Sequence, residues 1–209
     1  MKLCVFDFDS TLMDGETIDF LADELNFKEK VSAITEKAMQ GQMDFFESLT
    51  TRVNFLKGLK EKKLNEICHN LPYMQGAKET IEELKKRGYK VAVFSGGFRN
   101  ATSFAREILK FDVDFSNTLH VKDGVLTGNV GGEMMFDFSK GDMLQRLQAI
   151  LGIDEKSTMV VGDGANDISM FKFAGTKVAF CAKEILKKEA NVVIEEKDLT
   201  KILEEKLCM

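Results

Sequence analysis

The stretch MKLCVFDFDSTL, residues 1–12, determines how the rest of the chain is interpreted. Its apolar run from Leu3 to Phe6 predicts a buried β-strand. Asp7 and Asp9 follow at a spacing of two residues, so both carboxylates are expected on the same side of the strand end. Two such acids repel each other unless a cation lies between them. By itself, the stretch fits a strand that ends in a polar, solvated turn equally well.

Composition and charge limit the kinds of partner. With 209 residues, of which 44% are hydrophobic and 30% charged, the chain can bury a normal core in one large domain or in a domain with an insert. Its net charge of −5 argues against nucleic acid as the main partner, because binding to a phosphate backbone requires a basic face.

The possible metal ligands and the expected location follow from a few absences. The four cysteines and two histidines form no metal-binding spacing, so a metal site would use oxygen ligands, which suit Mg²⁺. No signal peptide precedes the first strand, and no apolar run approaches the ~18 residues that span a bilayer. We therefore expect a cytoplasmic protein without a membrane partner.

After Leu12 the sequence divides into a helical part and an alternating part. Residues 16–71 show helical periodicity without a strand and predict a small all-helical insert, with helices over 17–25, 31–38, 45–56 and 60–71. Pro72, the only proline, marks its end. Beyond it we expect helices over 77–87, 98–109, 139–151 (with Ser139 as the N-cap), 168–173 and 199–207, strands over 90–94, 158–162, 178–180 and 192–194, and a hairpin over 120–127 that turns at Asp123-Gly124.

This alternation predicts the fold class α/β, with a doubly wound, mainly parallel sheet. Right-handed crossovers place the carboxyl ends of the parallel strands at one edge, where ligands bind in such sheets. Polar groups stand at three of the expected strand ends: the two early aspartates, Ser95-Gly96-Gly97, and Asp163-Gly-Ala-Asn166-Asp167.

Each of these groups has an ordinary explanation and a functional one. Ser95-Gly96-Gly97 is either a simple connection to the next helix or a cradle for an anion. The oxygen-rich run from Asp163 to Asp167 is either a turn with a helix cap or a set of ligands for a hard cation. Lys140 is either a surface lysine or a cation held near a helix start by an adjacent anion.

Taken together and in this order, the four groups resemble the four motifs of the haloacid dehalogenase superfamily of phosphohydrolases. Further stretches, over residues 7–16, 45–52, 95–98, 121–128 and 162–171, are similar to the phosphoserine phosphatases within that superfamily. The resemblance covers nearly the whole chain. One departure is Arg99, where many members carry an acid, and we expect this side chain on the surface.

The resemblance implies an architecture and an activity. Residues 1–13 and 75–209 would form a haloacid dehalogenase-like (Rossmannoid) catalytic core, and residues 14–74 a helical cap that selects the substrate. The reaction would be Mg²⁺-dependent hydrolysis of O-phospho-L-serine to L-serine and phosphate through an aspartyl-phosphate, the last step of L-serine biosynthesis.

The resemblance also implies a role for individual residues. Asp7 would be the nucleophile and Asp9 the general acid and base. One Mg²⁺ would be held by Asp7, the Asp9 backbone carbonyl and Asp163. Ser95, Gly96, Lys140 and Asn166 would bind the phosphoryl group, with Asp167 and Thr11 in support. Glu16 would bind the ammonium and Arg52 the carboxylate of the substrate, with Phe45 as an apolar wall and Met39 as a weaker pocket candidate.

Two other functions remain compatible with the sequence. One is a phosphatase or phosphotransferase that uses another small substrate or acceptor, such as phosphothreonine, homoserine or an alcohol, because the same fold hosts many substrates. The other is a catalytically silent phosphate-binding module, which we would expect to lack at least one of Asp7, Asp9, Lys140 and Asp163, all of which are present.

Overall fold

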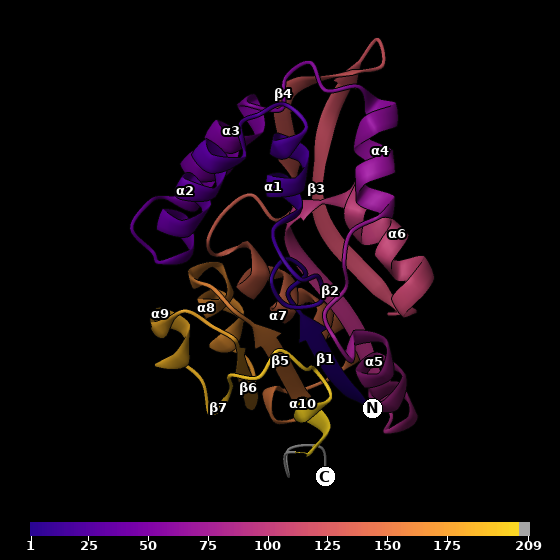
Figure 1. Cartoon of the computed structure of the whole chain (residues 1–209). Helices are drawn as coiled ribbons and strands as arrows, with labels where there is room; N and C mark the ends of the chain where they lie inside the picture. The colour runs from indigo at the N-terminus through magenta and orange to yellow at the C-terminus, as the bar shows by residue number, and fades with distance from the viewer. Residues whose placement is uncertain (205–209) are drawn as a thin grey trace.

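Within residues 1–204, the part of the chain that the computed structural model describes, seven strands form one sheet in the order β4-β3-β2-β1-β5-β6-β7 (Figure 1). All neighbouring strands are parallel except β3 and β4, which are antiparallel. The strands are β1 (Lys2–Phe6), β2 (Tyr89–Phe98), β3 (Val113–Lys122), β4 (Val125–Gly132), β5 (Thr158–Gly162), β6 (Thr176–Phe180) and β7 (Val192–Ile194). The predicted α/β class and doubly wound sheet are confirmed.

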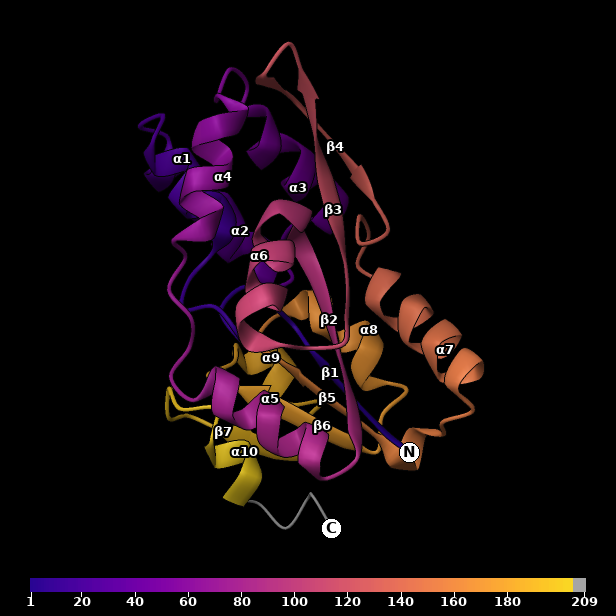
Figure 2. The same ribbon diagram turned by 90° about the vertical axis from the view of Figure 1, so that its right-hand side faces the viewer.

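Helices cover both faces of this sheet. Alternate residues of β1 face opposite cores, with Cys4 and Phe6 on one side and Leu3 and Val5 on the other. Figure 2 shows α5 and α7 on opposite faces of the sheet. The helices of the sheet-bearing part are α5 (Ala77–Lys86), α6 (Arg99–Leu109), α7 (Ser139–Leu151), α8 (Ile168–Phe171), α9 (Glu184–Lys187) and α10 (Lys201–Glu204), with 3₁₀ turns η1 (Glu155–Ser157) and η2 (Ala165–Asp167).

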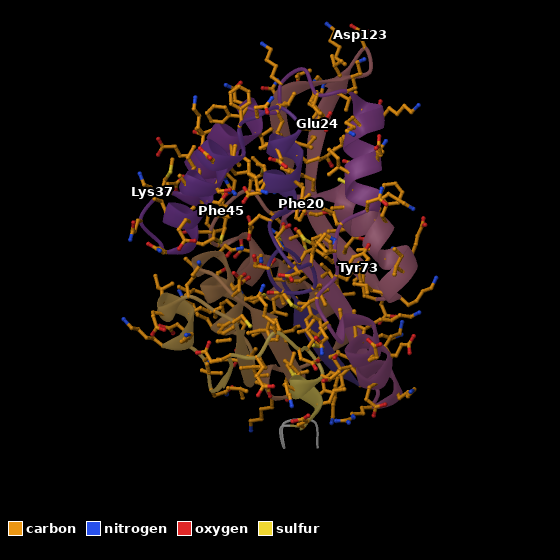
Figure 3. The ribbon with its side chains drawn as sticks, viewed as in Figure 1. Phe20, Glu24, Lys37, Phe45, Tyr73 and Asp123 are labelled. Carbon is orange, nitrogen blue, oxygen red and sulfur yellow. The ribbon has the colours of Figure 1, made fainter. Side chains whose placement is uncertain are left out.

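The residues between β1 and α5 form a separate group of helices beyond the end of the sheet. They are α1 (Thr17–Asp23), α2 (Lys28–Met39), α3 (Phe45–Asn54) and α4 (Glu61–His69), as the helical periodicity predicted. The β3–β4 hairpin extends from the sheet to this group, and Asp123 lies at its tip (Figure 3). There the Gly58 N–H donates to the Leu126 carbonyl, and the Leu126 N–H donates to the Leu59 carbonyl, both at 2.8 Å.

Some predicted elements differ from the structure. Strand β2 does not stop before Ser95 but continues to Phe98, because β3 runs beside it and Phe98 pairs with Asn117 after an irregular stretch. The first part of β3 was not predicted, although Val113 and Phe115 alternate with polar residues there; the buried polar Asn117 interrupts the apolar row.

Smaller corrections concern helix ends. Ser139 is the first residue of α7 rather than its cap, since its hydroxyl accepts from the Phe136 N–H. The short helix α9 was not predicted. Of the last predicted helix, residues 201–204 are helical, and residues 205–207 lie outside the described residues. Among the described residues, no helix is long and apolar enough to cross a membrane.

Candidate active site

A pocket lies where the carboxyl ends of β1, β2 and β5 meet the helices α1, α2 and α3. Phe45 stands at this boundary, at the start of α3 (Figure 3). The lining residues come from both parts of the chain: Asp7, Asp9, Glu16, Ile18, Met39, Phe45, Leu49, Arg52, Gly96, Gly97, Phe98, Asp163 and Asn166. Parallel strands end at one edge of a sheet, which explains why segments far apart in sequence converge here.

A buried lysine links two of the aspartates. Lys140 Nζ lies 2.6 Å from Asp7 Oδ1 and 2.6 Å from Asp167 Oδ1, and its side chain is only 3% exposed. Burial lowers the pKa of Lys140, but the carboxylates of Asp167 and Asp7 outweigh this effect, so its pKa is raised overall. Lys140 is therefore a fixed positive charge at the bottom of the site.

Three buried carboxylates gather beside this lysine. Asp7, Asp163 and Asp167 each offer an oxygen atom, and these three atoms lie within 4.8 Å of one another. Burial and the neighbouring Asp167 raise the pKa of Asp7 to about 7, even though Lys140 opposes the shift. Burial and the charges of Asp7 and Asp167 raise the pKa of Asp163 well above its usual value. Such an all-oxygen set with excess negative charge fits a hard divalent cation.

Asp167 differs from the other two acids because its oxygen atoms already have partners. Its Oδ2 accepts from the Asp163 N–H at 3.0 Å and from the Gly164 N–H at 3.1 Å, and its Oδ1 accepts from Lys140. These bonds fix the loop after β5, and so the position of the Asp163 backbone.

Asp9 is oriented by the first residue of α1. Asp9 Oδ1 accepts from the Thr17 N–H at 2.7 Å and from the Thr17 hydroxyl at 2.5 Å. Burial raises the pKa of Asp9, although these bonds and nearby cations oppose the shift. Its Oδ2 accepts from the Ser95 hydroxyl at 3.5 Å. The two early aspartates thus have different surroundings.

The Ser95-Gly96-Gly97 segment runs past these carboxylates as extended backbone. The Gly97 N–H donates to Ser95 Oγ at 2.9 Å, and a Cβ atom on Gly97 would lie 2.5 Å from Asp9 Oδ2. The buried Asn117 side chain donates to the Gly96 carbonyl at 3.0 Å, where the regular pairing of β2 and β3 is interrupted. A glycine is therefore required for the close approach to Asp9.

Two charged residues from the helical part line the same pocket. Burial and the nearby charge of Asp9 raise the pKa of Glu16 to about 8, and its Oε1 accepts from the Ser10 hydroxyl at 2.7 Å. Arg52 is 3% exposed, and burial lowers the pKa of its guanidinium. Among residues 1–204, no carboxylate oxygen lies within 4.0 Å of that guanidinium, which donates only to the Ser48 carbonyl and the Thr35 hydroxyl.

Comparisons with known proteins show to which family the chain belongs. A sequence profile of the haloacid dehalogenase-like hydrolases matches residues 1–175. The chain is 63% identical to a phosphoserine phosphatase of Wolinella succinogenes, over 97% of this chain and 98% of that protein. The chain belongs to the phosphoserine phosphatase family of haloacid dehalogenase-like hydrolases.

Solved structures extend the match to three dimensions. One shows a phospho-aspartyl intermediate analogue of phosphoserine phosphatase, with a TM-score of 0.95, 51% identity and 97% of each chain covered. Another shows a substrate-bound phosphoserine phosphatase, with a TM-score of 0.94, 50% identity and 97% of each chain covered. Like these family members, the chain is an enzyme, a phosphatase that acts on phosphoric monoesters.

The sequence analysis named many of the residues that line or adjoin this pocket, but not all of them. Met39, Leu49 and Ile18 also line the pocket, and Thr17 holds Asp9. Met39 was a weak candidate, and the other three carried no signal beyond helical spacing. Conversely, the buried Thr11 hydroxyl has no hydrogen-bond partner among the described residues.

Proposed function

We propose that this phosphatase hydrolyses O-phospho-L-serine to L-serine and phosphate, with Mg²⁺ as cofactor and Asp7 as nucleophile. This would be the last step of L-serine biosynthesis. The observation that carries the substrate assignment is Arg52, a buried guanidinium without an ion-pair partner among residues 1–204, on the same pocket as Asp7. A substrate carboxylate would supply the missing anion by a bidentate contact.

The hydrogen bonds of Asp7 support its role in attack. Its Oδ1 accepts from Lys140 Nζ at 2.6 Å and from the Phe8 N–H at 2.7 Å, whereas its Oδ2 has no such bond among the described residues. The free Oδ2 would attack phosphorus and form an aspartyl-phosphate. Lys140 would offset the negative charge of the nucleophile and of the phosphoryl group, to which Ser95, Gly96 and Asn166 would also donate.

The surroundings of Asp9 support proton transfer. Its raised pKa favours the protonated form, and Thr17 occupies Oδ1, so that Oδ2 has only the long contact with the Ser95 hydroxyl among the described residues. Asp9 would give this proton to the departing serine oxygen and then take one from the water that hydrolyses the intermediate. Holding the carboxyl group at two points keeps it within reach in both steps.

The acidic cluster supports a magnesium site. Asp7, Asp163 and the Asp9 backbone carbonyl would hold the ion, while Asp167 would keep its contacts with the loop and with Lys140. When bound, Mg²⁺ would supply positive charge that reduces the repulsion between Asp7 and the phosphoryl group.

The helical part, residues 14–74, would act as a cap over the active site. It provides Glu16, Arg52 and Phe45 to the pocket, whereas the acidic cluster and Lys140 belong to the core. Glu16 would bind the substrate ammonium, Arg52 the carboxylate, and Phe45 the apolar side. Closing this cap would exclude bulk water from the intermediate.

A substrate panel tests the proposal directly. Phosphate release would be measured from O-phospho-L-serine, O-phospho-L-threonine, phosphoethanolamine and sugar phosphates, with and without Mg²⁺. We expect the largest kcat/KM for phosphoserine and no turnover without the metal. A larger kcat/KM for an ester without an amino-acid group would refute the substrate assignment, and a phosphorylated alcohol as product would favour phosphoryl transfer.

The cytoplasmic location that the sequence analysis expects stays a prediction.

A further inference from the structure

The Arg52 guanidinium is held by one hydroxyl group of a neighbouring helix and by one backbone carbonyl of its own helix. Arg52, on α3, donates through one terminal nitrogen to Thr35 Oγ1 on α2 at 3.0 Å, and through Nε to the Ser48 carbonyl at 3.3 Å. Thr35 is 5% exposed. The Ser48 contact lies within α3 itself. Among the described residues, the hydrogen bond to Thr35 is therefore the one that holds the Arg52 side chain against another helix.

The Thr35 hydroxyl is itself oriented. It donates to the Val31 carbonyl at 3.1 Å, so its lone pairs are directed away from the α2 backbone and toward Arg52. A threonine at this position therefore acts as an acceptor for the guanidinium.

A buried acid adds charge behind the same group. Asp19, on α1, accepts from the Ser32 hydroxyl at 2.6 Å, and its negative charge acts on Arg52. The other Asp19 oxygen is buried without a hydrogen-bond partner among the described residues. Asp19, Ser32 and Thr35 line a cavity beside the active-site pocket, but none of them lines that pocket. The charges of Asp9, in the active-site pocket, and of Asp19, in this cavity, both act on Arg52.

We propose that Thr35 is a positioning residue for substrate selection: its hydroxyl holds Arg52 in the orientation that binds the substrate carboxylate. The inference rests on the proposed function, because Arg52 must bind that carboxylate. A free arginine side chain has many rotamers, and a preformed orientation lowers the entropy lost when the substrate binds. The Thr35 hydroxyl bonds only to Val31 and Arg52 among the described residues, and not to the residues that would bind the phosphoryl group, so its effect should depend on the substrate.

The experiment compares Thr35→Val, which removes the hydroxyl at nearly constant shape, with Thr35→Ser, which keeps it. We expect Thr35→Val to lower kcat/KM for O-phospho-L-serine about tenfold or more, mainly through KM, because it removes a hydrogen bond to a charged group. The value for phosphoethanolamine, which lacks the carboxylate, should change by less than about twofold. Thr35→Ser should restore most of the activity on phosphoserine.

A second measurement separates positioning from general loosening of the helices. In an Arg52→Lys background, adding Thr35→Val should cause no further loss, because the two residues act as one unit. Thr50→Val is a matched control, since the Thr50 hydroxyl bonds only to the backbone of its own helix. An equal loss on both substrates, a full additional loss in the Arg52→Lys background, or wild-type values for Thr35→Val would overturn the inference. A wild-type enzyme that does not prefer phosphoserine to phosphoethanolamine would instead refute the proposed substrate.

Discussion

Lys140 Nζ donates to Asp7 Oδ1 at 2.6 Å, in a place where both side chains are almost completely buried. A buried carboxylate without compensation would stay protonated and could not attack phosphorus. The pKa of Asp7 is nevertheless raised to about 7 by burial and by the charge of Asp167, so this lysine compensates only part of the cost. The remaining negative charge is what a divalent cation would offset, and the reactivity of Asp7 is therefore expected to depend on both cations.

Replacing the nucleophile should abolish turnover without unfolding the protein. In Asp7→Asn, the side-chain carbonyl can still accept from Lys140 and the Phe8 N–H, but the neutral amide cannot attack phosphorus to form the acyl-phosphate intermediate. We expect phosphate release to fall by about a thousandfold or more, with a Tm close to that of the wild type. Appreciable residual turnover would move the nucleophile to another residue.

Removing the buried guanidinium should affect substrate binding selectively. Arg52→Ala should raise KM for O-phospho-L-serine by about 30-fold or more, as expected when a buried charged hydrogen bond of about 2 kcal/mol or more is lost. Phosphoethanolamine should change much less. Arg146→Ala, which truncates an exposed arginine, is the control. Equal losses on the two substrates would contradict the carboxylate contact.

Glu16 makes stability depend on pH in a definite direction. Its pKa is about 8 in the folded chain, mainly because of burial, against 4.5 for the ordinary side chain. The folded state therefore holds this proton more tightly, so stability is retained below pH 4.5 and is lost as pH rises toward 8. The glutamine of Glu16→Gln cannot ionise. In the absence of metal at pH 8.5, this variant should therefore have a Tm several degrees above that of the wild type, which corresponds to a free energy of unfolding larger by on the order of 2 kcal/mol.

The same variant provides the control for this pH effect. At pH 4.5 or below, both proteins carry an uncharged group at this position, and their Tm values should converge. Thermal unfolding over a pH series measures the difference. A constant gap at all pH values would show that Glu16 does not titrate as described.

Magnesium should stabilise the fold through the acidic cluster. At a concentration 100 times its Kd, a ligand that binds only the folded state adds about 2.7 kcal/mol, which is about 5–10 °C in Tm for a chain of this size. Asp163→Asn removes one proposed ligand and should eliminate this shift, together with metal-dependent turnover. Asp23→Asn, at an exposed site, should keep both. A full shift in Asp163→Asn would remove Asp163 from the metal site.

The outcome for Ser95-Gly96-Gly97 illustrates what sequence reasoning could and could not predict. The residue types correctly placed this segment at the sheet edge, because a strand and a helix flank it. The segment was expected to lie beyond the strand, as a connection to the next helix or as an anion cradle, yet it is part of β2, and Asn117 of the neighbouring strand bonds to the Gly96 carbonyl. That partner is the buried polar residue of β3, in a part of the strand that was not predicted.

The sequence by itself determined the local secondary structure and the kinds of functional side chain that the site contains. Apolar runs that end in Asp7, Ser95 and Asp163 specify parallel strands whose ends meet, and Lys140 supplies the only basic group among these motifs. Such features depend on neighbours along the chain, which a periodic pattern records.

The tertiary structure decided which of these groups contact each other and so what each can do. The asymmetry between Asp7, held by Lys140, and Asp9, held by Thr17, is absent from the motif in which they stand two residues apart. The contact of Arg52 with Thr35 likewise joins two helices that have no common pattern. Long-range contacts depend on how helices and strands pack, because burial, and with it each pKa, is set by neighbours that are distant in sequence.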